Sequence, residues 1–354
     1  MKKLLSLFCV LTLCTALFAG CASSNQDGGS GDISDSGAGT SQAGTVDDVP
    51  TADPVNVRVA ALKGPTAMGM VQFMDQVDSG VLTDNNYTFS IAAAIDEVTP
   101  MLAKGELDIA AIPANVSSVL YNNSSAGFQV LAINTLGVLY IVESGNTVQS
   151  MEDLRGKTIY ASGKGATPEY ALNYILSANG IDPTADVTIE WKSEHAECLS
   201  ALMAQENAIA MLPQPFVTMA QTKSDQIRVA LDLTQEWDAL QKGNETPSAL
   251  ITGVVVARRE FVEQNPDAVS AFLDHYKTSV EYVNSNTDGA AQMVGQYEIV
   301  TAEVAEKALP ACNITFIEGK EMQEKLSGYL AVLFEQNPRS IGCALPGDDF
   351  YFSR

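Results

Sequence analysis

The sequence is poor in the residues on which catalysis and covalent cross-linking depend. Its 354 residues include 2 His, 2 Trp and 6 Cys. With only His195 and His275, and with no Gly-x-Ser-x-Gly turn, a Ser-His-Asp hydrolase lacks its parts. Only three cysteines follow residue 21, which is too few for a disulfide-dense scaffold. We expect no enzyme and no cofactor. A Cys312–Cys343 disulfide and unpaired buried thiols both stay open.

Basic residues are scarce as well. The chain carries 20 Lys and Arg against 43 Asp and Glu, which gives a formal net charge of -23. Such an acidic surface repels phosphate backbones, so nucleic acid is not expected as a partner. The content of 46% hydrophobic and 18% charged residues is that of a globular protein and predicts a sizeable core.

Long apolar runs are absent except at the N-terminus. Lys2 and Lys3 precede an uncharged stretch that ends in Gly20-Cys21, which predicts a signal peptide over residues 1–20. The stretch is short for a membrane span. The sequence Leu-Phe-Ala-Gly-Cys at its end resembles the bacterial lipobox, in which the Cys thiol is lipidated before cleavage. We therefore expect a lipid anchor on Cys21, and an ordinary signal peptide with an incidental cysteine is the alternative.

The next segment is polar. Residues 22–53 are mainly Ser, Gly, Asp and Thr, a composition that cannot bury enough apolar surface to fold. Residues 21–53 are thus expected to be a disordered tether, whose 32 residues after Cys21 span about 30 Å. A lipidated cysteine, a tether and a globular body form a layout shared by solute receptors, adhesins and lipoprotein enzymes. The body has to decide between them.

In the body, short apolar runs alternate with stretches of helical periodicity. This alternation predicts an α/β fold with mostly parallel sheets. Strands are expected at residues 55–62, 107–112, 130–133, 138–142, 158–160, 187–191, 208–212, 227–231 and 251–257. Helix-start signals occur at Thr99-Pro100, Asn115, Ser150 to Asp153, Thr167 to Glu169, Asn265-Pro266 and Thr301.

Five short stretches give this order a more specific meaning. They are the turn Gly64-Pro65-Thr66, residues 104–110, residues 153–157, residues 163–169, and residues 258–261 with Asn265-Pro266. Together they resemble the type II periplasmic-binding-protein fold, in the branch of nitrate, sulfonate, taurine and thiamine-precursor binders. The resemblance implies two lobes joined by a hinge, each a mostly parallel sheet flanked by helices. Lobe one would comprise residues 54–145 and 237–354, and lobe two residues 146–236.

A ligand is expected where strands end and helices begin, because unpaired backbone N–H groups point into that crevice. Glycines there allow close approach of the backbone, and hydroxyl and amide side chains supply hydrogen bonds. For each polar residue, a helix cap or a turn role is the alternative. The expected ligand-binding residues are Gly64, Pro65, Thr66, Ala114 and Asn115 in lobe one, and Gly163, Gly165, Ala166, Thr167, Pro213 and Gln214 in lobe two.

Each of several other residues near these strand ends has two possible roles. Trp191 and Phe216 either stack on a flat ligand or pack in the core. His195 and Cys198 lie within one helical turn and either bind a metal or belong to a solvated helix face; we expect no metal. The expected crevice contains no Arg, which favours a neutral or singly charged solute, with heteroaromatic compounds among the candidates.

The resemblance implies a solute-binding lipoprotein of an ABC importer. Such a protein captures a small molecule between its lobes by hinge motion and delivers it to a permease with its ATPase. It is expected to be a monomer, anchored by lipid on the extracytoplasmic face of the cell membrane. An extracellular enzyme and a sensory or adhesive lipoprotein of the same fold are the alternatives.

Overall fold

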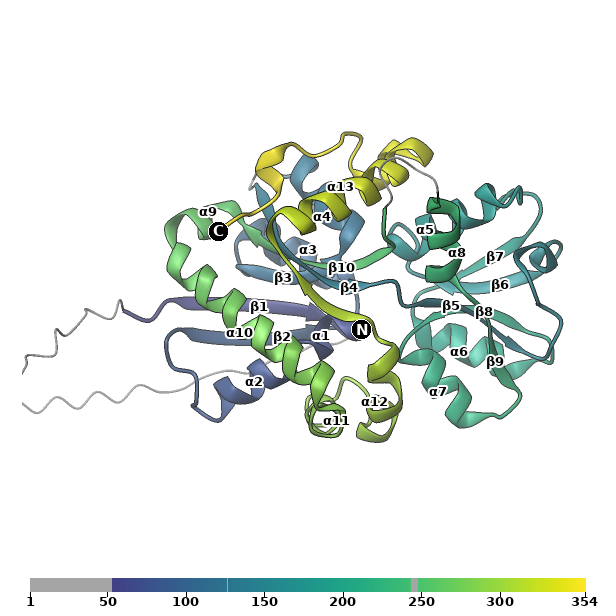
Figure 1. Cartoon of the computed structure of the whole chain (residues 1–354), viewed down its shortest axis with the longest axis horizontal. Coiled ribbons are helices and arrows are strands. Elements are labelled where there is room, and N and C mark those ends of the chain that lie inside the picture. Colours follow the sequence, from purple (N-terminus) through teal and green to yellow (C-terminus); the bar gives the residue numbers. More distant parts are fainter. Residues whose placement is uncertain (1–52, 126, 243–247) are drawn as a thin grey trace, which may run out of the picture. The chain divides into compact units, whose positions relative to one another are not determined.

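The computed structural model describes residues 53–125, 127–242 and 248–354. The predicted signal peptide, the lipidation of Cys21 and nearly all of the tether lie outside the described residues. The residue contacts keep Ala52–Arg354 in one unit. Within this unit the strands form two separate sheets, which we use to define lobe one and lobe two (Figure 1).

Lobe one is built on six strands and lobe two on five. The order across the first sheet is β11 (Ile314–Ile317), β4 (Phe128–Leu136), β10 (Ile251–Arg258), β3 (Ile109–Pro113), β1 (Asn56–Leu62) and β2 (Asn86–Ala92). The order across the second sheet is β7 (Thr188–Lys192), β6 (Thr158–Ser162), β8 (Ile209–Pro213), β5 (Leu139–Ser144) and β9 (Ile227–Asp232). The predicted α/β fold is confirmed, but β2 and β11 were not predicted, and antiparallel pairs are as common as parallel ones in these sheets, which were expected to be mostly parallel.

The strand directions place several strand ends at one edge of each sheet. In lobe one, β1 is parallel to β2 and β3, and β10 runs antiparallel to both β3 and β4. In lobe two, β6 is parallel to β7 and β8, and β5 runs antiparallel to both β8 and β9. The carboxyl ends of β1, β3 and β4 therefore share one edge, and those of β6 to β9 share another. We call these the crevice edges.

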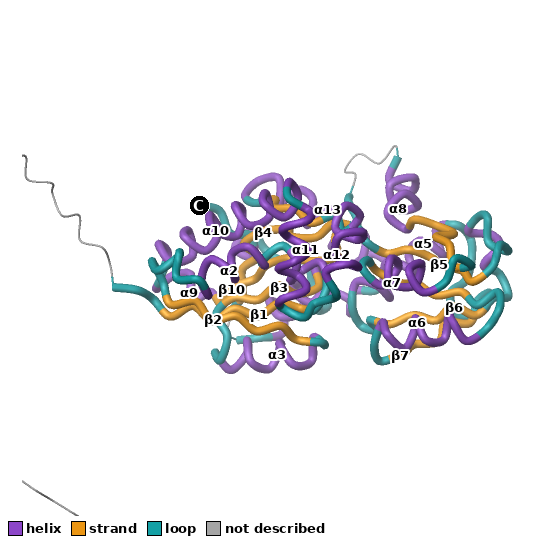
Figure 2. Tube along the Cα trace, turned by 90° about the horizontal axis from the view of Figure 1, so that it is seen from below, coloured by secondary structure: helices purple, strands orange, loops and turns teal. Residues whose placement is uncertain are grey.

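Helices cover both faces of each sheet (Figures 1 and 2). In lobe one, one face is covered by α2 (Val71–Asp78), α10 (Pro266–Ser285), α11 (Thr287–Gln296) and α12 (Ala302–Ala308), and the other by α3 (Ile95–Lys104), α4 (Ala114–Asn123) and α13 (Gly319–Gln336). In lobe two, α6 (His195–Ala204) and α7 (Phe216–Lys223) cover one face, and α5 (Thr167–Ala178) and α8 (Leu233–Gln241) the other. The short helices are α1 (Pro65–Met68), α9 (Arg259–Gln264) and 3-10 turns at Met151–Leu154, Leu309–Ala311, Pro338–Ile341 and Asp348–Phe350.

The lobe boundaries differ from the predicted ones. β5 pairs with β8 and β9, so the chain enters lobe two at Gly137 and Val138, before the predicted boundary at residues 145 and 146. α8 packs against α5, β5 and β9, so lobe two extends beyond the predicted end at residue 236. The sequence marks a strand at 138–142, but sheet membership depends on pairing with distant segments.

Three predicted helix starts are corrected. α3 begins at Ile95, where the Glu97 carboxylate accepts a hydrogen bond from the Ala94 N–H at 3.0 Å; Thr99-Pro100 therefore lies inside the helix. Asn115 is the second residue of α4, after the N-cap Pro113, and Thr167 is the first residue of α5, after the N-cap Ala166. Neither side chain caps its helix. The starts at Asn265-Pro266 and Thr301 are confirmed.

Candidate solute-binding site

The turn after β1 forms the first part of the crevice edge in lobe one. Gly64 has a φ of 135°, a conformation that favours glycine, and Pro65 is the first residue of α1. The Thr66 hydroxyl donates a hydrogen bond to the Leu62 carbonyl at 2.7 Å. The hydroxyl proton thus holds the turn in place, and the oxygen keeps a lone pair that can accept.

Asn115 links the two lobes. Its Nδ2 donates to the carbonyl oxygens of Gly165 at 3.3 Å and Ser340 at 3.0 Å, and its Oδ1 accepts from the Thr167 hydroxyl at 3.3 Å. Asn115 and Thr167 are fully buried, and Ala114 beside them is buried too. The structure therefore brings three predicted residues from the two lobes together, and their polar groups bond to one another.

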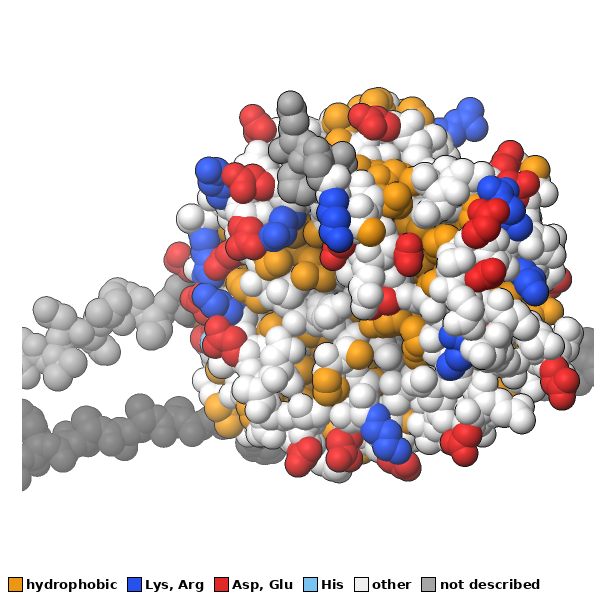
Figure 3. Space-filling view, turned by 45° about the vertical axis from the view of Figure 1, so that its right-hand side comes forward, with side chains coloured by type: hydrophobic (Ala, Val, Ile, Leu, Met, Phe, Trp, Pro, Cys, Tyr) orange, Lys and Arg blue, Asp and Glu red, His pale blue; other side chains and the backbone are white. Residues whose placement is uncertain are grey.

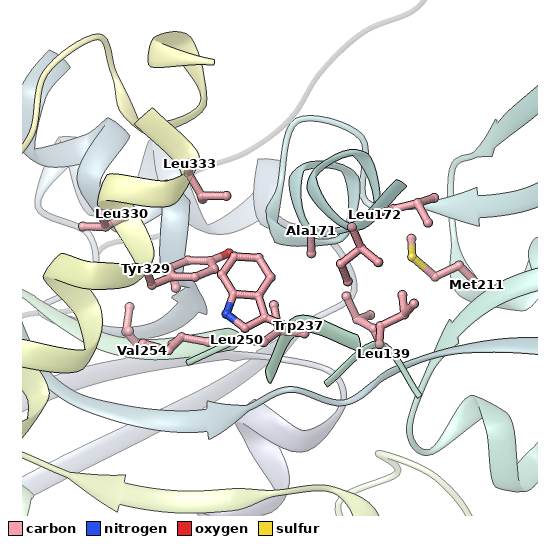
Figure 4. Packing of buried hydrophobic residues seen from close by; sticks show 14 of the residues in the cluster. Leu139, Ala171, Leu172, Met211, Trp237, Leu250, Val254, Tyr329, Leu330 and Leu333 are labelled. Carbon is pink, nitrogen blue, oxygen red and sulfur yellow. The ribbon is translucent and has the colours of Figure 1, made fainter. Parts of the chain in front are cut away.

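Aromatic packing continues this contact between the lobes (Figure 4). The Tyr329 hydroxyl donates to Thr167 Oγ1 at 3.1 Å, and burial raises the pKa of Tyr329 above its usual value. The Trp237 ring lies 5.6 Å from that of Tyr329 and 4.7 Å from that of Tyr174, measured between ring centroids. Trp237 Nε1 also donates to the Ser248 hydroxyl at 3.1 Å. A dry core therefore supports one side of the contact.

The glycine turn of lobe two has a clear backbone role. Gly163 and Gly165 have φ values of 83° and 80°, which favour glycine. A Cβ on Gly163 would lie 2.8 Å from Pro168 Cγ, whereas a Cβ on Gly165 would meet nothing within 4 Å. The Gly165 N–H donates to Glu169 Oε2 at 2.6 Å. The turn therefore needs both glycines for its conformation, whatever it binds, and Ala166 completes it as the N-cap of α5.

The last predicted residues follow β8. Pro213 ends this strand, and Gln214 is almost fully buried. Gln214 Oε1 accepts hydrogen bonds from the Thr218 hydroxyl at 2.9 Å and from the Thr218 N–H at 3.3 Å. The Gln214 side chain therefore helps to begin α7, which agrees with the turn-or-cap alternative.

Sequence reasoning undervalued His195. Its Nδ1 lies 2.5 Å from the Ser162 hydroxyl oxygen, and its ring centroid is 5.1 Å from that of Phe216. These residues stand at the ends of β6 and the starts of α6 and α7, at the crevice edge. Part of the residue surface is exposed, but enclosure of the ring lowers the pKa of His195 to about 4. A histidine at the first turn after a strand end is the signal that could have identified it.

The metal and disulfide alternatives for the neighbouring cysteines find no support. Within residues 53–125, 127–242 and 248–354, no group of three or more His, Cys, Asp and Glu side chains is placed to hold a metal ion. Cys198 and Cys312 are buried free thiols, and Cys343 is an exposed one. Burial raises the pKa of the Cys312 thiol to about 12, so this thiol is protonated at neutral pH.

The second group that sequence reasoning missed consists of unpartnered polar atoms. In the part of the chain that the structure describes, both amide atoms of Asn134 and the hydroxyls of Thr135, Thr234 and Thr252 are buried without a hydrogen-bond partner. Asn134 and Thr135 lie just before the end of β4, and Thr234 and Thr252 are the second residues of α8 and β10. These atoms thus gather beside the two places where the chain passes between lobes. Buried polar groups normally have partners, so the concentration is informative.

Positive charge at the site is limited. Of the seven Arg residues in the sequence, six form ion pairs with carboxylates in the structure, and Arg339 is exposed. The six pairs are Arg58–Asp108, Arg155–Asp186, Arg228–Glu143, Arg258–Asp108, Arg259–Asp349 and Arg354–Asp274. On the face shown in Figure 3, basic side chains are dispersed among acidic ones. The predicted crevice residues are themselves neutral, and Lys63 and Lys164 lie exposed beside them in the two glycine turns.

Two pockets lie away from these residues. One of about 340 Å³ lies beside edge strand β7 and is lined in part by Glu169, Asn173 and Trp191. The other, of about 470 Å³, lies beside edge strand β2 and is lined in part by Phe89 and Tyr297. Trp191 therefore faces a surface pocket, and Phe216 packs on His195. Neither pocket includes a predicted ligand-binding residue.

Two α/β lobes joined at their crevice edges are the architecture of periplasmic solute-binding proteins. A family model described as "ABC transporter, phosphonate, periplasmic substrate-binding protein" matches residues 73–306, and the chain belongs to this family. The family consists of transport proteins rather than enzymes, which confirms the predicted class. No helix within the described ranges has the length and apolarity needed to cross a membrane.

Solved structures agree on the fold. An ABC transporter protein from Parabacteroides distasonis is 20% identical, with a TM-score of 0.69, over 84% of this chain and 99% of that one. The aliphatic sulphonate-binding protein of Escherichia coli is 16% identical, with a TM-score of 0.68, over 85% and 92%. The nitrate-binding protein of Synechocystis PCC 6803 is 14% identical, with a TM-score of 0.56, over 71% and 69%. A search of curated protein sequences finds no match.

Proposed function

We propose that the protein is the lipid-anchored solute receptor of an ABC importer, held by Cys21 on the extracytoplasmic face of the cell membrane. It captures one small molecule between its lobes and presents the closed form to a permease and its ATPase. The observation that carries this proposal is the direct contact of Asn115 in lobe one with Gly165 and Thr167 in lobe two. Such a contact gives hinge closure a defined end point.

The solute is proposed to be neutral or singly charged. The protein is proposed to bind it as a monomer. The lack of a free Arg at the crevice edges supports the proposed charge, because a multiply charged anion is usually held by Arg side chains, and six of the seven arginines are already paired. The predicted ligand-binding residues remain proposals. Those with a free hydrogen-bonding group or an open approach are Gly64, Thr66 and Gly165.

Native mass spectrometry of the mature protein, purified without refolding, tests the capture of a solute. We expect a second species heavier by the mass of one small molecule, which disappears after denaturation. The same molecule, added back, should raise the melting temperature and be recovered unchanged. Conversion of the added molecule into a product would favour the enzyme alternative instead.

The anchor is tested by Cys21→Ser. Because the thiol is the proposed site of lipidation, we expect the variant to leave the membrane fraction or to stay unprocessed, whereas a Ser23→Ala variant should fractionate like the wild type. Metabolic labelling with a fatty acid should label the wild-type protein but not the Cys21→Ser variant. A processed, labelled and membrane-bound Cys21→Ser protein would contradict the assignment.

A further inference from the structure

Asn134 is the most unusual polar residue of the crevice edge. Its side chain is fully buried at the carboxyl end of β4, and neither the carbonyl oxygen nor the NH₂ group has a hydrogen-bond partner among the described residues. The conclusion is the same if oxygen and nitrogen exchange places. A buried amide without partners destabilises the protein that carries it, because the amide loses its hydrogen bonds to water and gains none. We therefore expect this amide to have a partner in the working protein.

The surroundings keep this amide next to the predicted site. A Cβ built on Gly253 would lie 2.5 Å from Asn134 Oδ1 and 2.7 Å from Thr66 Cγ2. Gly253 therefore lets the Asn134 side chain lie over β10, beside the Thr66 turn. The neighbouring Thr135 hydroxyl is also buried and unpartnered. Asn134, Thr135 and Thr66 thus all lie around Gly253, where Thr66 presents its methyl group and Asn134 its amide oxygen.

The Tyr276 hydroxyl approaches from α10. It is fully buried, and burial raises the pKa of Tyr276 above its usual value, although the nearby Asn134 amide opposes this rise. The Asn134 amide is near enough to affect the pKa of Tyr276, but neither group forms a hydrogen bond of normal geometry with any described residue. The Tyr276 hydroxyl stays protonated at neutral pH and can both donate and accept.

The chemistry of these groups restricts the ligand. An asparagine amide presents one acceptor and one donor side by side, so its full complement is an N–H next to a C=O. A phosphonate, sulfonate or nitrate group offers acceptors only and would leave Asn134 Oδ1 unpaired. The arginines that usually bind such anions are engaged with carboxylates, apart from the exposed Arg339.

We infer that the Asn134 amide forms paired hydrogen bonds with a cis-amide group of the solute, such as that of a lactam, a cyclic ureide or an oxo-pyrimidine ring. Thr135 and Thr66 would lie beside this contact. This inference rests on the proposed function, because it names the solute class of the same crevice. It separates the chain from relatives whose names refer to sulphonate and nitrate.

The test begins with titration calorimetry on the mature protein. The cyclic amides uracil, hydantoin and 2-pyrrolidone are compared with methylphosphonate, ethanesulfonate and nitrate. We expect binding by at least one cyclic amide and by none of the anions. Tighter binding of an anion would overturn the inference and leave the proposed function standing. If neither class binds and the purified protein carries no small molecule, both fail.

Substitution then separates recognition from a structural role. Asn134→Leu removes both hydrogen-bonding atoms at similar volume, so we expect at least a hundredfold loss of cyclic-amide affinity together with an unchanged or higher melting temperature of the ligand-free protein. Asn134→Ser provides a smaller replacement should the leucine fail to fold. Unchanged affinity in either folded variant overturns the inference, as does the same loss for a ligand without an amide edge.

Asn122→Leu is the matched control. The Asn122 Nδ2 donates to the carbonyl oxygens of Ile341 at 2.8 Å and Ala344 at 2.7 Å, so this amide is already paired. We expect the opposite pattern, a lower melting temperature with unchanged affinity. If ordered water alone satisfied Asn134, the Asn134→Leu variant would keep its affinity, which is the overturning result above.

Discussion

The crevice edges of the two lobes differ in how their polar groups are satisfied. In lobe two, Ser162 contacts His195, Gln214 accepts from Thr218, and Thr167 bonds to residues of lobe one. In lobe one, Thr66 and Asn115 have partners, but Asn134 and Thr135 near the end of β4 have none, whereas lobe two leaves only the Thr234 hydroxyl buried and unpartnered among its described residues. A surface that is already hydrogen-bonded gains little from a polar ligand, whereas an unsatisfied one gains much. We infer that lobe one provides the main recognition and that lobe two closes over it.

The same contrast does not extend to buried charge, because each lobe holds a carboxylate in an ion pair. Asp108 in lobe one is bound by Arg58 at 2.7 Å and Arg258 at 2.8 Å, and Glu143 in lobe two by Arg228 at 2.9 Å. Burial alone would raise the pKa of either carboxyl, but hydrogen bonds to the ionised form outweigh it and hold both pKa values below normal. Both carboxylates are structural.

The largest expected loss of stability follows from removing one of these buried carboxylates. Asp108→Asn removes the ionised acceptor that two arginines share, so the free energy of unfolding should fall by about 1.5–3 kcal/mol, measured by urea denaturation at pH 7. Arg259→Gln is the control, because its partner Asp349 is 58% exposed and such pairs contribute at most about 1 kcal/mol. Equal losses in the two variants would contradict the structural role of Asp108.

The sequence predicted the local features of this comparison and missed the non-local ones. Pro266 after Asn265 and the Thr301 cap mark helix starts through neighbours in the chain, and both were correctly predicted. The partners of Asn115 and Thr167 lie about 50 residues apart or more, so no local pattern announces them. Folding alone decides whether such residues cap helices or join lobes.

Asn134 is a second residue whose role could not be predicted from the sequence. It interrupts the apolar run of β4, where a polar residue is normally interpreted as the end of a strand, and the sequence prediction ended that strand at residue 133. Its meaning depends on Gly253 and Thr66, which reach it from two other elements. Unsatisfied hydrogen bonding is a property of the folded chain, so the sequence could not reveal it.

A smaller effect is expected in lobe two, where His195 should make the stability of the protein depend on pH. Enclosure lowers the pKa of His195 to about 4, whereas an unfolded chain has a histidine pKa of about 6.5. Between these values the unfolded state binds more protons, so stability is full above pH 6.5 and falls as the pH drops towards 4. Because the residue is partly exposed, we expect a loss of about 1–2 kcal/mol, measured by urea denaturation at pH 7 and 4.5.

The variant that isolates this effect is His195→Asn, which should remove most of the extra loss on acidification. Ser162→Ala should keep it, because enclosure of the ring rather than the Ser162 contact lowers the pKa. An identical pH dependence in wild type and His195→Asn would assign the acid sensitivity to the buried carboxylates instead.

The smallest expected effect concerns the contact that joins the two lobes. Thr167→Val keeps the shape of the side chain but removes the hydroxyl that donates to Asn115 Oδ1 and accepts from Tyr329. Losing these hydrogen bonds should lower the free energy of unfolding by about 1 kcal/mol. The same loss weakens the closed arrangement of the lobes, so small-angle scattering should give a larger radius of gyration for the ligand-free variant than for the wild type. Adding the solute should restore the compact form, because lobe-one contacts with the ligand do not involve Thr167.

Ser200→Ala, on the exposed side of α6, is the control and should change neither quantity. If Thr167→Val lost solute binding as completely as Asn134→Leu, recognition would be shared equally between the lobes, and the distinction between a recognising lobe and a closing lobe would fail.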